Sequence, residues 1–142
     1  MTQIFFYHNA EDRLRATAAL IGKAYVQRKR VLVFAPDADV AAALDRSLWT
    51  HPPIGFVPHV RADSPLAAET PVLITDSLTS LPQDERLINL SHEVPPGFSR
   101  FTSVIEVVGQ ADDERLAGRQ RARYYKDRGY EITFFDCAGR RG

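Results

Sequence analysis

Cysteine is almost absent from this chain, since Cys137 is the only one among 142 residues and no internal disulfide can form. A chain of this length buries enough apolar surface to fold without such cross-links, and the scarcity of thiols fits a reducing, cytoplasmic compartment. Net charge is also lacking, because eighteen basic residues balance eighteen acidic ones. An anion-binding site would therefore have to come from local clustering of Lys and Arg.

Long apolar runs are missing as well. Nowhere do eighteen apolar residues follow one another, so no membrane span is expected. The first residues, MTQIFFYHNAEDR, lack a basic region, and their apolar stretch is too short for a signal peptide. The composition, 44% hydrophobic and 25% charged, is typical of a soluble globular protein. We expect a single domain over residues 1–142 and no membrane partner.

The motifs of common enzyme sites are absent too. The turns after the first two predicted strands read HNAED and APDAD, without the glycines of G-x-G-x-x-G and with acidic residues that repel phosphate. The four histidines lack the spacings that arrange a zinc site, and Cys137 has no neighbouring base. Asp76 ends a predicted strand, where it is as well suited to capping the next turn as to acid-base chemistry. We therefore expect no catalytic residue, no metal and no cofactor.

The chain does contain short apolar runs, many of them with β-branched residues, that alternate with longer segments whose apolar residues recur at helical spacing. Strands are predicted at residues 3–8, 30–35, 71–76, 85–90, 103–109 and 130–135. Helices are predicted from the first turn to about residue 28, from PDAD to about Trp49, and over 112–128 with Gly129 as the stop. This alternation predicts a three-layer α/β/α sandwich with a mostly parallel, Rossmann-like sheet.

The last predicted helix carries a row of cations. At about 100° per residue, one stripe roughly 80° wide holds four of them, here called the basic ridge: Arg115, Arg119, Arg123 and Lys126. Arg121 and Arg128 fall on other faces, while Leu116 and Tyr124 flank the stripe or turn toward the sheet and leave an apolar notch. The guanidinium group of arginine binds carboxylates or phosphates through two parallel hydrogen bonds. The alternative is a solvated charged face in which Asp112 pairs with an arginine one turn away.

A second feature is the segment LWTHPPIGFVPH, residues 48–59, which holds the only tryptophan and three prolines. Trp49 comes at the end of a predicted amphipathic helix, and the Pro52 and Pro53 pair ends helical geometry and stiffens the loop that follows. Two interpretations remain open. Trp49 and Phe56 either plug the core or form a rigid patch on which a partner protein docks.

Together these stretches resemble a known family. FFYH, KRVLVFAPD with LDRSLWTHPPIGFVPH, PVLI, LINLS, and VVG with RQRARYYKDRGYEI occur in the same order as in the chi subunits of bacterial DNA polymerase III. The resemblance implies a non-catalytic accessory of the clamp loader. It implies that the chain joins the psi subunit to the acidic, phenylalanine-ending tail of single-stranded DNA-binding protein.

The resemblance also implies site positions. The tail-binding cations fall on the basic ridge, with Val108 and Tyr124 as apolar neighbours, and Trp49 and Phe56 match the side associated with psi and, in some relatives, a competing helicase. Sequence-specific nucleic-acid binding is not implied. The chain departs from the family at RADSPLAAET and CAGRRG. The alternative from another class is a nucleotide- or phosphate-handling enzyme of Rossmann-like fold that uses the ridge as its anion site.

Overall fold

A computed structural model describes residues 2–50, 59–61, 72–78 and 85–137. Its strands are β1 (Gln3–Ala10), β2 (Val31–Phe34), β3 (His59–Arg61), β4 (Val72–Thr75), β5 (Arg86–Asn89), β6 (Ser103–Gly109) and β7 (Ile132–Asp136). Its helices are α1 (Arg13–Val26), α2 (Ala38–Thr50) and α3 (Asp112–Asp127), with a 3₁₀ turn, η2 (Phe98–Arg100).

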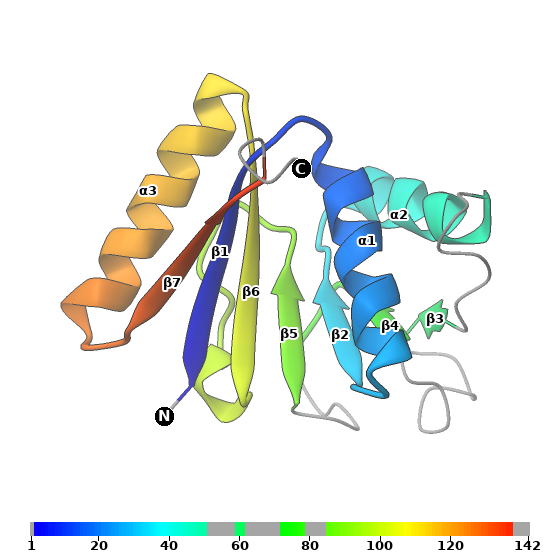
Figure 1. The fold of residues 1–142 in the computed structure, drawn as a ribbon, viewed down its shortest axis with the longest axis horizontal. Coiled ribbons are helices and arrows are strands. Elements are labelled where there is room, and N and C mark those ends of the chain that lie inside the picture. Colours follow the sequence, from blue (N-terminus) through cyan, green and yellow to red (C-terminus); the bar gives the residue numbers. More distant parts are fainter. Residues whose placement is uncertain (1, 51–58, 62–71, 79–84, 138–142) are drawn as a thin grey trace.

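The strands form one sheet in the order β3-β4-β2-β5-β6-β1-β7, and every neighbouring pair is parallel (Figure 1). The predicted parallel sheet is thus confirmed. Because all strands run the same way, their first residues lie at one edge of the sheet and their last residues at the other. We call these the amino edge and the carboxyl edge.

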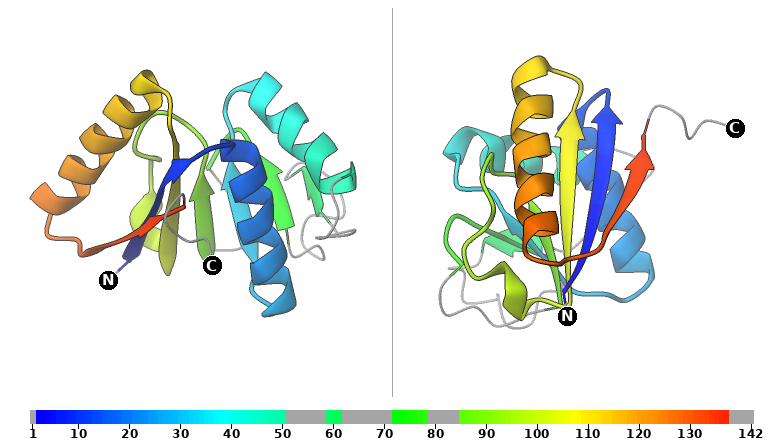
Figure 2. Two further views of the ribbon diagram at one scale, coloured as in Figure 1. Left: turned by 45° about the horizontal axis from the view of Figure 1, so that its top comes forward. Right: turned by 90° about the vertical axis from the view of Figure 1, so that its left-hand side faces the viewer.

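Two apolar clusters lie on opposite faces of the sheet, as the alternation of side chains along a strand requires. Val31 and Val33 of β2 pack with α1 and α2, whereas Leu32 and Phe34 pack with Tyr125 of α3. Figure 2 (right) shows α3 and α1 on opposite sides of the strands. The molecule is therefore a three-layer α/β/α sandwich, as predicted.

Local sequence signals account for most element ends. The side chain of Asp12 caps α1 by accepting a hydrogen bond from the backbone of Arg15. Gly129, just after α3, has a φ of 87°, a conformation that glycine adopts without strain. Within the part of the chain that the structure describes, no helix is both long and apolar enough to cross a bilayer.

One expectation about loops was wrong. His59 was expected within a rigid loop, but it begins β3, which pairs with β4 through three residues. The stretch HEVPPGFSR contains η2, and Phe98 within it is buried against α3. Strands and turns of three residues are too short to show a hydrophobic periodicity. Whether they form is therefore determined by tertiary packing.

Candidate functional site

The basic ridge lines a groove of about 730 Å³ that runs between α3 and the strands β1 and β7. All four of its cations contribute to this groove, which confirms that helical spacing places them on one side of α3: Arg115, Arg119, Arg123 and Lys126. The opposite wall comes from His8 and Asn9 of β1 and from Phe134 and Asp136 of β7. The groove therefore has cations along its α3 wall and residues of β1 and β7 along its other wall.

The floor of the groove is apolar. Phe6, Val108 and Phe134 lie there, and Phe134 remains 48% exposed although it is aromatic. Gly118 lets α3 approach the sheet closely, since a Cβ at this position would come within 3.0 Å of a Val108 methyl group. A ligand in the groove would meet cations on one side and aromatic or aliphatic carbon beneath.

The arginines of the ridge form no ion pair within the part of the chain that the structure describes. Arg115, Arg119 and Arg123 are exposed, and none forms an ion pair with another described residue. Asp112, the internal partner that the solvated-face interpretation requires, does not pair with Arg115. Lys126 places its ammonium 5.6 Å from the centroid of the Phe134 ring. The ridge is thus available to an anionic ligand.

Val108 and Tyr124 were both expected beside the ridge, and the structure separates them. Val108 lines the groove, whereas Tyr124 does not. The Tyr124 ring packs edge-on against Phe98 at 6.3 Å between centroids, and the guanidinium of Arg128 lies 3.5 Å from its centroid. Leu116, expected to help form the apolar notch, is 55% exposed and not among the groove residues. The apolar surface comes mainly from the strands.

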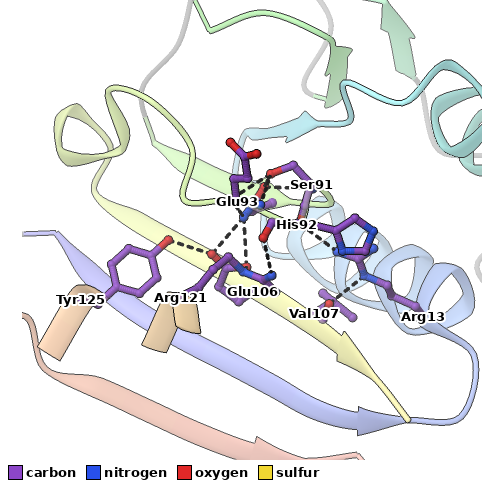
Figure 3. Close-up of polar contacts among 9 residues, drawn as sticks. Arg13, Ser91, His92, Glu93, Glu106, Val107, Arg121 and Tyr125 are labelled. Carbon is purple, nitrogen blue, oxygen red and sulfur yellow. Dashed lines mark hydrogen bonds and ion pairs between the residues drawn. The ribbon is translucent and has the colours of Figure 1, made fainter. Parts of the chain in front are cut away.

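On its inner side, α3 is attached to the sheet by a buried carboxylate (Figure 3). Glu106 occupies the middle of β6 and is fully buried. Arg121 Nε donates to its Oε1 at 2.8 Å, and the hydroxyl of Tyr125 donates to its Oε2 at 2.7 Å. Arg121 and Tyr125 are four residues apart on α3, so one carboxylate engages the inner face of two successive helical turns.

The network continues into β5 and the loop that follows. Asn89, the register partner of Glu106, donates from Nδ2 to both carboxylate oxygens at 3.1 and 3.0 Å. Its own Oδ1 accepts from the hydroxyl of Ser91 at 2.6 Å. Arg121 also donates to the backbone carbonyl of His92 at 3.2 Å (Figure 3). Each polar group is therefore satisfied by another group of the protein.

Burial and charge also affect the ionisation of this network. Removal from water raises the pKa of the Tyr125 hydroxyl, and the negative charge and hydrogen bond of Glu106 raise it further, so this tyrosine remains a proton donor. Burial lowers the pKa of Arg13, as does the charge of Arg121. Arg13 donates to the backbone carbonyls of Val107 and Ser91, which ties α1 to the same region.

A nucleotide site would be expected elsewhere, at the carboxyl edge between β1 and β6, whose following helices leave toward opposite faces. The turns there carry exposed carboxylates: Glu11, Asp12, Asp112 and Asp113. Such a concentration of negative charge repels phosphate. In the residues that the structure describes, no three His, Cys, Asp or Glu side chains cluster as metal ligands would.

The other predicted surface is only partly described. Trp49 lies in the last turn of α2, one residue after the buried Leu48. Phe56 lies outside the described residues. The expected docking role of Trp49 and Phe56 therefore stays a prediction.

Sequence reasoning missed the contributions of β1 and β7 to the groove, Phe134 among them, as well as Gly118 and the buried Glu106. The alternation in ITFFD was a signal for Phe134, because an edge strand exposes every second residue. Glu106 interrupts the apolar run SVIEVVG, and Arg121 and Tyr125 follow at helical spacing. A carboxylate within a strand that is buried on both faces requires a hydrogen-bonding or cationic partner. Arg121 and Tyr125 were candidates for that partner.

Comparisons with known proteins agree with one another. The family described as "DNA polymerase III chi subunit, HolC" matches residues 1–133. DNA polymerase III subunit chi of Pseudomonas aeruginosa is 32% identical over 138 residues, which cover 93% of this chain and 94% of that protein. Its Escherichia coli namesake is 29% identical over 127 residues, covering 86% of each. Among solved structures, the C-terminal domain of Dbp5 from S. cerevisiae is similar in fold alone, with a TM-score of 0.59 and 13% identity over 96% of this chain and 90% of that one.

Proposed function

Because the chain belongs to the DNA polymerase III chi subunit family, an accessory subunit of the bacterial replicase, we propose that it connects the clamp loader to single-stranded DNA-binding protein. In this proposal the groove beside α3 holds the acidic C-terminal tail of that binding protein. A second surface around Trp49 and Phe56 holds the psi subunit or a competing helicase. The chain itself acts by binding, in the cytoplasm, and not by catalysis.

The composition of the groove is the observation that carries the proposal. An acidic tail that ends in phenylalanine offers carboxylates along its length and an aromatic ring beside its terminal carboxylate. The basic ridge supplies guanidinium groups that pair with no described residue, and such groups hold carboxylates in charge-assisted hydrogen bonds. Val108 and Phe134 supply apolar surface for the ring. If α3 merely presented a solvated charged face, the guanidinium groups alone would be expected, without the apolar surface beside them.

Loss of the terminal phenylalanine is expected to weaken tail binding strongly. Burying such a side chain contributes about 1.5 to 3 kcal/mol, which corresponds to roughly a ten- to hundredfold change in Kd. Isothermal titration with two synthetic acidic peptides, with and without the terminal Phe, measures this difference. An enzyme that used the ridge for phosphate would be indifferent to the phenylalanine, so equal affinities for the two peptides would reject tail binding.

The ridge should also act through its position and not through bulk charge. Replacing Arg119, near the middle of the stripe, with alanine is expected to reduce tail affinity by about 1 kcal/mol, about fivefold. Binding should weaken with added salt, since exposed charges are screened over about 8 Å at physiological ionic strength. Arg15→Ala is the matched control, because Arg15 is exposed on α1, on the other face of the sheet.

Arg121 is unsuitable as that control although it belongs to the same helix. Its side chain is only 3% exposed and bonds to Glu106, so its removal would disturb the packing of α3. If Arg15→Ala lowers tail affinity as much as Arg119→Ala does, the groove has no special role. If tail affinity does not respond to salt, the ridge is not the binding surface.

A further inference from the structure

Charge is divided unevenly between the two edges of the sheet. At the carboxyl edge, acidic residues follow one strand after another: Asp12, Asp37, Asp76, Asp112 and Asp136. At the amino edge, cations gather at the end of α1 and before the strands: Lys23, Arg28, Lys29, Arg86 and Arg100. Among the described residues, Glu85, Asp127 and Glu131 are acidic exceptions there. Among the described residues, the amino edge thus carries more cations than carboxylates, which favours polyanions although the chain as a whole has no net charge.

A second hollow opens at this amino edge, on the face of the sheet that α1 covers. Its volume is about 440 Å³, within the range of sites that hold small molecules. Lys23 and Lys29 come from the end of α1 and the turn after it, and Arg86 comes from the start of β5. None of these three cations forms an ion pair with another described residue. We call this feature the amino-edge hollow.

Aromatic side chains form the other wall of the hollow. Phe135 of β7 stacks on Tyr7 with 4.7 Å between ring centroids and 18° between planes, and on Phe5 with 6.4 Å and 28°. The three rings are only partly buried, and all three line the hollow. Among the described strands β7 is the last of the sheet, so none of them covers the outer side of this aromatic row.

Unpaired cations next to a row of partly exposed aromatic rings are the combination that binds single-stranded nucleic acid without regard to sequence. The cations follow the phosphates, while the rings offer surfaces on which unpaired bases stack. An acidic peptide would use the cations but not a row of three rings, and duplex DNA keeps its bases stacked within the helix. We propose that the amino-edge hollow and the cations around it form a binding site for single-stranded DNA.

This site is separate from the groove that holds the tail in the proposed function. The hollow lies on the α1 face and the groove lies on the α3 face, and they share no lining residue. Both reach β7, the strand at this side of the sheet, and its neighbour β1. Contact with exposed DNA at one face is therefore compatible with a tail bound at the other.

The test uses the full chain alone and a fluorescently labelled oligothymidine of about 20 nucleotides, with anisotropy as the measurement at low salt. We expect binding whose affinity falls with salt, with a log-log slope of about −2 if three phosphates are neutralised. The double substitution Lys23→Gln with Lys29→Gln should lower affinity about tenfold and make the slope shallower. Phe135→Leu should lower affinity about fivefold or more and leave the slope unchanged, since it removes stacking and no charge.

Two controls separate this site from bulk charge and from the tail groove. Arg119→Ala should leave DNA binding unchanged, and Lys23→Gln with Lys29→Gln should leave binding of the acidic peptide unchanged. Thermal melting verifies that each variant is folded, and the two exposed lysines do not threaten the fold even if Phe135→Leu does. Absence of binding at low salt, equal affinity for duplex of the same length, or an equal loss on Arg119→Ala would each overturn the proposal. The peptide measurement is independent, so this failure would leave the tail proposal standing.

Discussion

Replacing Glu106 with alanine is expected to lower the free energy of unfolding by about 3 to 5 kcal/mol. Glu106 is the carboxylate that neutralises Arg121, and both side chains are buried. Without it, a guanidinium group would remain in the interior with its charge uncompensated, and the hydroxyl of Tyr125 and the amide of Asn89 would each lose an acceptor. Chemical denaturation monitored by circular dichroism measures the change.

Two further variants identify the cause. Tyr125→Phe retains the ring that packs against Phe98 and removes only the hydroxyl, so a smaller loss of about 1.5 to 3 kcal/mol is expected. Glu93→Ala changes an exposed carboxylate nearby and should be close to neutral. If Glu106→Ala melts like the unmodified chain, the network is not what holds α3 on the sheet.

The same network has a consequence for the groove. Arg121 and Tyr125 anchor the inner face of α3, whereas the basic ridge occupies a different face of the same helix. The carboxylate therefore fixes the rotation of α3 about its axis, and with it the direction in which the ridge faces. Gly118 fixes the separation, because it lets the helix lie against Val108.

Replacing Trp49 with alanine is expected to weaken binding of psi or of a helicase by about 2 kcal/mol or more, while the fold stays intact. Trp49 follows Leu48 in the last turn of α2, and Leu48 belongs to the core. A tryptophan that anchors a partner loses little entropy on docking, hence the large expected effect.

Thermal melting distinguishes this outcome from a role in the core. If Trp49 fills the interior, its removal should cost about 3 to 5 kcal/mol of stability, and partner binding would fall only because the domain unfolds. His51→Ala and His59→Ala serve as controls, since docking needs neither imidazole. Tail binding should survive Trp49→Ala. A variant that melts normally but loses both partners would contradict two separate surfaces.

The sequence by itself determined the parts of this protein that depend on local periodicity. Short apolar runs and helical spacing predicted six of the described strands, all three α-helices and the parallel sheet. The basic ridge was predicted for the same reason, because four cations on one helix share a side whenever that helix forms. The spacing of residue types along the chain is enough to predict helices, strands and the face of a helix on which a side chain lies.

Only the tertiary structure decided which strand residues meet that helix. Phe134 and Val108 form the groove floor, and Glu106 receives Arg121 and Tyr125, because β6, β1 and β7 are neighbours in the sheet. The order of strands follows from how the two faces bury their apolar surface as a whole, which no local pattern encodes. Tyr124 shows the difference: its helical position permits contact with the ridge, but packing against Phe98 holds its ring outside the groove.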